Sequence, residues 1–301
     1  MAISFSELDS LSMVWWNVAL SPPSSSTRDK ASIGKIEKVS EILSIFINKK
    51  YDLICLGEVS TEDMRKLSKL LNLEELKYSY IEGADKQGLL YFDTAVIYSD
   101  KLVAQRQANN SYCFHEVLNI TDRNSVKLYE RYIFRIKDVD DDIVLYLSHW
   151  PSQLRNSEIQ TTQIAINLKS QIREILEEQR NVILMGDYNL EPYDKCIVNY
   201  LGSSRSKEEV MRNKTMLYNP CWKLLIPNDN DIIYGSYFYA QGHYHKWQIL
   251  DQCMFSLSFL EKPWFFDDNL VSIIDVNKLY ESNGDINPSD HWPISCTIFR
   301  K

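Results

Sequence analysis

One short apolar stretch places the strongest constraint on the fold of this chain. Residues 182–185 form an uninterrupted hydrophobic run that is too short for a helix and lacks polar alternation, which is typical of a strand covered on both faces. Gly186 follows and permits a tight turn as the strand leaves the core. Asp187 and Asn189 lie two residues apart, so in an extended chain both side chains point to the same side.

A carboxylate beside an amide oxygen suits a hard divalent cation or a phosphate ester. Asp and Asn are also common turn formers after a strand, so this pair alone does not establish a site. A functional interpretation requires other strands to end in the same way.

Three other predicted strands do end at polar residues: residues 12–18 at Asn17, residues 52–57 before Glu58, and residues 143–149 at His149. A histidine after a strand is more often structural than functional when it stands alone. The helix predicted over 154–179 leads directly into the strand over 182–185, which is the order of a βαβ crossover. Such a crossover makes its two strands parallel and brings their C-terminal ends to one edge.

Hydrophobic periodicity predicts further helices and strands along the chain. The helices lie over 30–49, 61–71 and from Pro192 to Leu201, and the strands lie over 91–98, 112–118, 127–136, 249–255 and 294–299. We find no internal repeat and no linker, so we expect one domain over residues 1–301.

Two late segments add acids and a second histidine. Asp251 interrupts the apolar run 249–255, and Asp290 and His291 lie in a polar loop before the last strand. Two histidines beside carboxylates could take a proton from water and support a leaving oxygen, and an acid such as Asp251 could fix the tautomer of a histidine base. Carboxylate and amide oxygens favour Mg²⁺, so the pattern indicates metal-assisted attack of water on a phosphate ester.

Charge and cysteine content narrow the class further. A net charge of −8 lacks the basic footprint of a passive nucleic-acid-binding module, but it does not exclude an enzyme whose bound cation bridges an acidic pocket and a phosphate. Cys55, Cys253 and Cys296 lie in apolar runs, and the six cysteines include no C-x-x-C pair, so we expect reduced thiols. No segment has the apolar length to cross a bilayer, and the N-terminal residues do not resemble a secretory signal, so we expect a cytoplasmic protein without membrane contact.

Six motifs occur in the order found in the endonuclease/exonuclease/phosphatase superfamily, the group of pancreatic deoxyribonuclease. They are Asn17 after a strand, Gly57-Glu58, Ser148-His149-Trp150-Pro151-Ser152, Gly186-Asp187-Tyr188-Asn189, Leu250-Asp251-Gln252 and Ser289-Asp290-His291-Trp292-Pro293. The resemblance runs from Trp15 to the C-terminus, and the segments 217–222 and 235–239 resemble bacterial members. It implies a four-layer α/β sandwich, with two mixed β-sheets packed face to face, helices outside and the site at one edge.

The resemblance also implies roles for individual residues. Glu58 and Asp290 would hold Mg²⁺ or Mn²⁺ with help from Asn17, which would also contact phosphate. His291, oriented by Asp251, would be the general base.

Other positions would handle the phosphate. Asp187 and Asn189 would position water and phosphate or bind a second metal, and His149 would contact the scissile phosphate and support the leaving oxygen. Arg131 matches a phosphate-contacting arginine, although an arginine on the surface of a strand explains it equally well.

The chain departs from the family pattern at a few places. Gly57 replaces a glutamine, Tyr188 replaces a phenylalanine, and Asp93-Thr94 stand where small residues are usual. None of these changes removes a catalytic group.

The expected activity is therefore that of a cytoplasmic Mg²⁺-dependent nuclease with nucleic acid as its substrate and no inferable stable protein partner. A phosphatase or phosphodiesterase on a small-molecule or lipid phosphate ester is the alternative, and a catalytically silent interaction module is a third. A long groove lined by arginines and aromatic residues of the region 202–246 would favour a polymer, and a closed pocket would favour a small ester.

Overall fold

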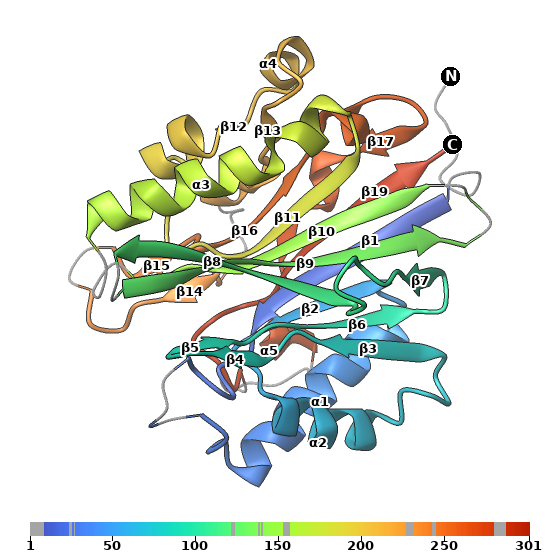
Figure 1. Cartoon of the computed structure of the whole chain (residues 1–301). Helices are drawn as coiled ribbons and strands as arrows, with labels where there is room; N and C mark the ends of the chain where they lie inside the picture. Colours follow the sequence, from blue (N-terminus) through green and yellow to red (C-terminus); the bar gives the residue numbers. More distant parts are fainter. Residues whose placement is uncertain are drawn as a thin grey trace.

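The structure is a computed structural model, and it describes residues 9–23, 26, 28–121, 124–137, 139, 141–152, 157–226, 232–242, 245–279 and 287–301. Two mixed sheets form its centre (Figure 1). The first has the strand order β17-β19-β1-β2-β6-β3, with β18 also paired to β19. Its strands are β1 (Asp9–Asn17), β2 (Leu53–Gly57), β3 (Tyr78–Glu82), β6 (Ala95–Ser99), β17 (Trp264–Phe266), β18 (Ser272–Ile273) and β19 (Ile294–Arg300).

The second sheet has the order β12-β13-β16-β11-β10-β9-β7, with β8 also paired to β9. Its strands are β7 (Leu102–Ala104), β8 (Cys113–Thr121), β9 (Asn124–Ile136), β10 (Asp142–His149), β11 (Asn181–Asp187), β12 (Ser203–Ser204), β13 (Leu217–Tyr218) and β16 (Asp251–Phe255). Two separate hairpins pair β4 (Asp85–Gln87) with β5 (Leu90–Phe92), and β14 (Tyr237–Phe238) with β15 (Trp247–Gln248).

Helices cover the outer faces of both sheets (Figure 1). The α-helices are α1 (Ile33–Asn48), α2 (Thr61–Leu71), α3 (Glu158–Glu177), α4 (Lys207–Arg212) and α5 (Val276–Leu279). Short helices of other types are η2 (Cys196–Tyr200), η3 (Pro220–Leu225), η4 (Leu257–Leu260) and η5 (Asp268–Leu270). Ser60 and Asp63 form a capping box at the start of α2, whose bounds agree with the sequence prediction.

Strand alternation divides the apolar side chains among three cores. In β1, Trp15 faces the second sheet and Trp16 faces the helices, because successive side chains of a strand point to opposite sides. Trp16 packs with Phe46 of α1 in the outer core of the first sheet. Leu168 of α3 packs with Leu184 of β11 in the outer core of the second sheet. The predicted four-layer α/β sandwich is confirmed.

Two sequence predictions about elements were wrong. The strand over 91–98 is divided, because Asp93 and Thr94 separate β5 from β6 and turn inward to Glu130. The helix from Pro192 to Leu201 is reduced to the five-residue η2. Several strands of two or three residues were also missed, since so short a segment has no measurable periodicity. No helix in the described part of the chain is both long and apolar enough to cross a membrane.

Candidate active site

Strand direction brings the predicted site residues to one edge of the sandwich. β1 is parallel to β2, and β10 is parallel to β11, so the two strands of each pair end side by side. The C-terminal ends of these four strands carry the residues that the sequence analysis singled out. β16 runs antiparallel to β11 with Asp251 opposite Asp187. β19 runs antiparallel to β1 with Ile294 opposite Trp15, so the loop before β19 returns to the same edge. We call this the site edge.

His291 and Asp251 form a buried pair at the site edge. His291 Nδ1 lies 2.7 Å from Asp251 Oδ2, and Trp15 Nε1 donates to the other oxygen, Asp251 Oδ1, at 2.7 Å. Because both oxygens of Asp251 are engaged, its orientation is fixed, and the carboxylate holds a proton on His291 Nδ1. In the neutral ring, Nε2 of His291 is thereby left as the atom that can accept a proton from water.

Asp187 lies between the two histidines. Its Oδ2 is 3.6 Å from His291 Nε2 and 3.9 Å from His149 Nε2. Asn17 Nδ2 donates to the same oxygen at 3.3 Å, and the backbone N–H of Asn189 donates to Oδ1 at 2.9 Å. Ala19 N–H donates to Asn17 Oδ1 at 3.1 Å, so both ends of that amide are engaged, and Asn17 positions Asp187.

His149 is held by a carboxylate whose role the sequence did not reveal. His149 Nδ1 lies 2.8 Å from Asp93 Oδ2, and Lys127 Nζ forms a buried ion pair with Asp93 Oδ1. Asp93, which stands where the family usually has a small residue, therefore fixes the orientation of His149, just as Asp251 fixes that of His291. Lys127 adds a cation to the lining of the site. A lysine within a predicted strand gave no signal that would have distinguished it from a surface residue.

These contacts shift the acid–base equilibria of the site. Burial disfavours the imidazolium of His291, but the carboxylates of Asp251 and Asp187 outweigh it and raise the pKa of His291 to about 10. Burial raises the pKa of Asp187 to about 6 against the opposing charge of His291. For His149, burial is again outweighed by Asp93, and its pKa lies above the usual histidine value. Perturbed values of this kind cluster where proton transfer occurs.

Two site residues adopt a backbone conformation that side chains other than glycine seldom take. Glu58 has φ 55° and Asn189 has φ 52°, both in the left-handed region. Asn189 is fixed further by its Nδ2, which donates to the Trp150 carbonyl at 2.8 Å. Such conformations cost on the order of 1 kcal/mol each and persist where the surroundings over-determine them.

Glu58 and Asp290 fit the predicted cation site. Both carboxylates line one cavity at the site edge, and neither accepts a hydrogen bond from a residue in the described ranges. Glu58 Oε1 lies 3.8 Å from His149 Nε2. Carboxylates without donors that face solvent-filled space are the hard oxygen ligands that Mg²⁺ and Mn²⁺ take. Asp187, Asp251 and His291 are also close enough to share an ion. Both oxygens of Asp251 are already occupied, so we regard the trio as a hydrogen-bonded Asp251–His291 pair with Asp187 at ion-pair distance.

Arg131 lies away from the site, which corrects its predicted role in phosphate binding. Glu130 and Tyr132 on either side of it face inward to Thr94, so alternation along β9 turns Arg131 to the outer face of the sheet. There its guanidinium lies 4.8 Å from the Phe114 ring and Nε donates to Gln107 Oε1 at 2.8 Å. Arg131 is therefore an arginine on the surface of a strand, which was the alternative interpretation.

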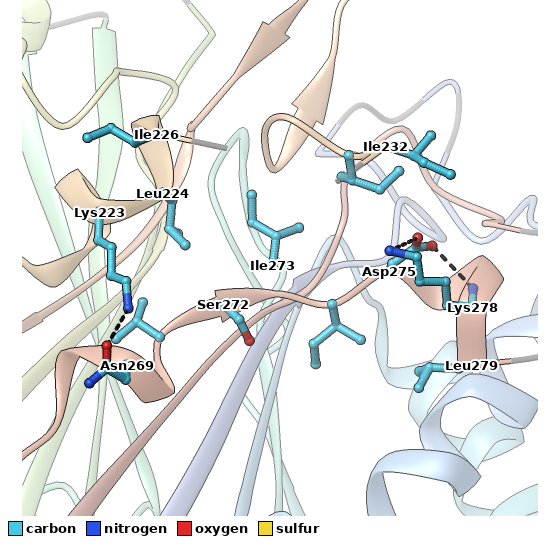
Figure 2. Close-up of a pocket in the computed structure, with 13 residues that line it drawn as sticks. Lys223, Leu224, Ile226, Ile232, Asn269, Ser272, Ile273, Asp275, Lys278 and Leu279 are labelled. Carbon is cyan, nitrogen blue, oxygen red and sulfur yellow. Dashed lines mark hydrogen bonds and ion pairs between the residues drawn. The ribbon is translucent and has the colours of Figure 1, made fainter. Parts of the chain in front are cut away.

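The cavity at the site edge measures about 660 Å³. Its described lining is Ala19, Pro22, Pro23, Ser26, Glu58, Leu89, Leu90, Tyr91, Val126, Lys127, His149, Trp150, Pro151, Ser152, Asp187, Asn189, Tyr237, Asp290 and His291. A second hollow of about 520 Å³ lies between η3, η5, β18 and α5 (Figure 2). Its described lining is mainly apolar, and the only carboxylate there, Asp275, is paired with Lys278 at 3.6 Å. The chemistry therefore resides in the first cavity.

Comparison with known proteins agrees with this architecture. Residues 23–291 match the model of the Endonuclease/Exonuclease/phosphatase family. The chain belongs to this family, which includes nucleases and phosphodiesterases. No curated protein sequence matches the chain.

Solved structures share the fold at low sequence identity. A family protein from Bacteroides thetaiotaomicron is 13% identical, with a TM-score of 0.61 over 98% of this chain and 96% of that chain. TDP2 of D. rerio complexed with single strand DNA product is 17% identical, with a TM-score of 0.57 over 96% and 98%. The human Nocturnin catalytic domain with bound sulfate anion is 13% identical, with a TM-score of 0.59 over 98% of each chain.

Proposed function

We propose that this protein is a metal-dependent phosphodiesterase that acts as a nuclease on DNA or RNA. The observation that carries the proposal is the alternation of carboxylates and imidazoles from Asp251 through His291, Asp187 and His149 to Asp93. Beside it lie the carboxylates of Glu58 and Asp290, which line the same cavity. The intact set of acids and histidines speaks against a catalytically silent module.

The roles follow from the geometry. In its neutral form, His291 takes a proton from water at Nε2, and Asp251 stabilises the imidazolium that forms. A cation bound at Glu58 and Asp290 would oppose the carboxylates that raise the pKa of His291 and so favour the neutral ring. Asp187, between the two histidines, and Asn189 orient the water and the phosphate. His149, whose pKa Asp93 raises, donates a hydrogen bond to the phosphate or the leaving oxygen. Mg²⁺ or Mn²⁺ held by Glu58 and Asp290 would neutralise phosphate charge when bound.

A cleavage assay with matched variants tests this function. Purified protein is incubated with plasmid DNA, single-stranded DNA and structured RNA, each with Mg²⁺, Mn²⁺ or EDTA. We expect cleavage that requires the metal and is lost in His291→Ala, because the variant lacks the base. His245→Ala serves as the control, since that imidazole is 67% exposed and pairs with Glu191. Equal cleavage by wild type and His291→Ala would refute the site assignment.

The substrate is proposed from the rim of the cavity. The region 202–246 contributes only Tyr237 to the described lining, so it does not form the long groove that would have favoured a polymer. The β4–β5 hairpin shapes the rim instead: Leu89 at its tip is 92% exposed, and Gly88 with φ 61° allows the tight turn. The Tyr91 ring lies 5.0 Å from the Arg28 guanidinium and 5.2 Å from Lys86 Nζ. An aromatic ring with two cations suits a base and its phosphate. The TDP2 of D. rerio, which shares the fold, was solved in complex with a single strand DNA product.

A small phosphate ester is the second candidate, because a cavity of about 660 Å³ also lies in the size range of small-ligand sites. The net charge of −8 likewise does not favour a long polyanion. We further propose that the protein acts in the cytoplasm, which its six free cysteines support. We also propose that it forms one domain, because the two sheets share an inner core.

Substitutions in the β4–β5 hairpin distinguish a nucleic-acid substrate from a small phosphate ester. In Tyr91→Ala we expect KM for single-stranded DNA to rise roughly five- to hundred-fold, since stacking on an aromatic ring contributes about 1–3 kcal/mol per base. Leu89→Ala removes only an apolar contact, so its effect on KM should be smaller. Hydrolysis of bis(p-nitrophenyl) phosphate should be unchanged. Ile226→Ala, which removes an exposed apolar side chain at the second hollow (Figure 2), is the matched control. An equal loss on both substrates would instead favour the small ester.

A further inference from the structure

Glu130 of β9 is a buried carboxylate that has no part in the proton transfers proposed above. It is 2% exposed, and it lies outside the described lining of the cavity at the site edge. Its Oε1 accepts a hydrogen bond from the backbone N–H of Asp93 at 3.2 Å. Its Oε2 accepts one from the Thr94 hydroxyl and one from the Tyr132 hydroxyl, the latter at 3.2 Å. Both oxygens are therefore engaged, and one of the donors belongs to the main chain of Asp93.

Asp93 connects Glu130 with two parts of the site. Its side chain lies 2.8 Å from His149 Nδ1, and its backbone carbonyl oxygen accepts a hydrogen bond from the Val59 N–H at 3.0 Å. Val59 follows Glu58, the expected cation ligand whose backbone lies in the left-handed region. The main-chain position of Asp93 therefore bears on both the imidazole that faces the phosphate and the turn that carries Glu58.

No strand ladder holds Asp93 in place. Asp93 and Thr94 lie at the break between β5 and β6, so neither belongs to a strand. The hydrogen bond of the Asp93 N–H is made to a side chain, that of Glu130. A buried backbone donor left without an acceptor is unfavourable, so the Glu130 carboxylate favours the main-chain position in which this bond is made.

Gly83 leaves room for the Glu130 carboxylate. A Cβ at position 83 would lie 2.1 Å from Glu130 Oε2 and 2.1 Å from the Tyr132 hydroxyl oxygen. The φ angle of Gly83 is not in the left-handed region, so the close approach of these polar atoms, rather than backbone conformation, requires the missing side chain. The Gly83 N–H also donates to the Thr94 carbonyl at 2.9 Å. Glu130 thus lies between the segment that enters the β4–β5 hairpin and the segment that leaves it.

Hydrogen bonding, rather than charge, explains the contacts of Glu130. Burial and the neighbouring Asp93 raise the pKa of Glu130 to about 7, so the side chain is partly protonated at neutral pH. A protonated carboxyl group can still accept a hydrogen bond from the Asp93 N–H through its other oxygen. A glutamine could therefore replace Glu130 in this contact, whereas an alanine could not.

We propose that Glu130 is a positioning residue: by holding the main chain of Asp93, it keeps His149 directed at the phosphate and supports the turn at Glu58. This role rests on the proposed function of the site, because it concerns the geometry of a group that would contact the phosphate. Glu130 itself touches neither the substrate nor the cation and acts through Asp93.

Proton NMR of two imidazole N–H groups tests this role without an assay of activity. His149 and His291 each direct Nδ1 to a carboxylate, so each should give a resonance far downfield, assigned by its loss in His149→Gln or His291→Gln. In Glu130→Ala we expect the His149 resonance to disappear or to move upfield, because Asp93 is no longer held. The His291 resonance should be unchanged, because Trp15 orients its partner.

Two further variants separate hydrogen bonding from charge. Glu130→Gln should keep the His149 resonance, since its side-chain oxygen still accepts from the Asp93 N–H. Gly83→Ala should lose the resonance although Glu130 is intact, because the added Cβ displaces the carboxylate. Gly83→Ala therefore decides the matter if Glu130→Ala does not fold.

Asp52→Ala is the matched control for loss of stability. Asp52 is also 2% exposed and accepts a backbone N–H, that of Ser12, at 3.0 Å. It precedes β2, whereas Glu58 follows the same strand, so it lies at the opposite end of the sheet from the site edge. This variant should lower the free energy of unfolding but keep both downfield resonances.

Activity supplies a second readout. Glu130→Ala should lower kcat for bis(p-nitrophenyl) phosphate roughly 10- to 100-fold with little change in KM, which is what loss of a supporting partner costs, and Glu130→Gln should restore it. A wild-type spectrum without the His149 resonance would overturn the proposal. So would an unchanged resonance in folded Glu130→Ala or Gly83→Ala, or its loss in Glu130→Gln or Asp52→Ala. If the resonances respond as expected but the wild type cleaves no substrate, the contact through Asp93 stands and the proposed nuclease function fails.

Discussion

Asp251→Asn should lower turnover about 10³- to 10⁴-fold while leaving the protein folded. The asparagine oxygen can still accept the hydrogen bond from Trp15 Nε1, so the Nδ2 group is left facing His291 Nδ1. That nitrogen must then accept a hydrogen bond, which moves the ring proton to Nε2. The base would present a proton where it should accept one from water. Steady-state cleavage of the preferred polymer measures the effect.

The control for this variant is Asp275→Asn. Asp275 is also a carboxylate paired with a cation, Lys278, but it lies in the second hollow (Figure 2) and should have no effect on turnover. Wild-type turnover in Asp251→Asn would show that the orientation of His291 does not depend on Asp251.

Asp93→Ala should reduce the free energy of unfolding by about 3–5 kcal/mol, because removal of one partner leaves a buried charge uncompensated. The fully buried Asp93 carboxylate serves both the Lys127 ammonium and the His149 imidazole. Burial raises the pKa of Asp93, but Lys127 and His149 outweigh it and hold the value well below the usual range. The stabilisation is therefore present above pH ~4 and is lost as pH falls through the depressed pKa of the folded state. Urea denaturation of both proteins from pH 7 to pH 3 measures the difference.

The double variant Asp93→Ala with Lys127→Met separates charge from packing. It removes the stranded ammonium, so we expect it to recover a substantial part of the lost stability. If the double variant is as unstable as the two single variants added together, Asp93 and Lys127 do not act as a pair.

The sequence predicted the fold where burial leaves a local pattern. β1, β2 and β11 each contain a continuous apolar run, and α2 has helical periodicity, so their positions followed from residues alone. Elements of two or three residues such as β12 and β18 depend on tertiary contacts and leave no such pattern. The break at Asp93 reflects a side chain drawn inward by partners on β9, which no local rule shows.

The candidate site was likewise predicted only where it leaves a local sequence pattern. Strand ends and motif order located Asp187, Asp251 and His291, whose proximity follows from strand direction. The pairing of Asp93 with His149 joins residues 56 positions apart, and its only trace in the sequence was a departure from the family pattern. Arg131 fitted a motif but occupies the wrong face of its strand, and a bulge between Glu116 and Val117 on the neighbouring strand makes side-chain direction there hard to infer.

The site edge draws its residues from both sheets, so the catalytic geometry depends on how one sheet is seated on the other. Trp15 and His291 belong to the first sheet and its loops, whereas Asp251 belongs to the second, and their hydrogen bonds cross between the two. Asn17 and Asp187 are joined across the same boundary. A small slip of the sheets would separate base from orienting acid without melting either sheet. Enzyme activity should accordingly be sensitive to the packing of the inner core between the sheets. Mild denaturant should abolish turnover before it changes the circular dichroism.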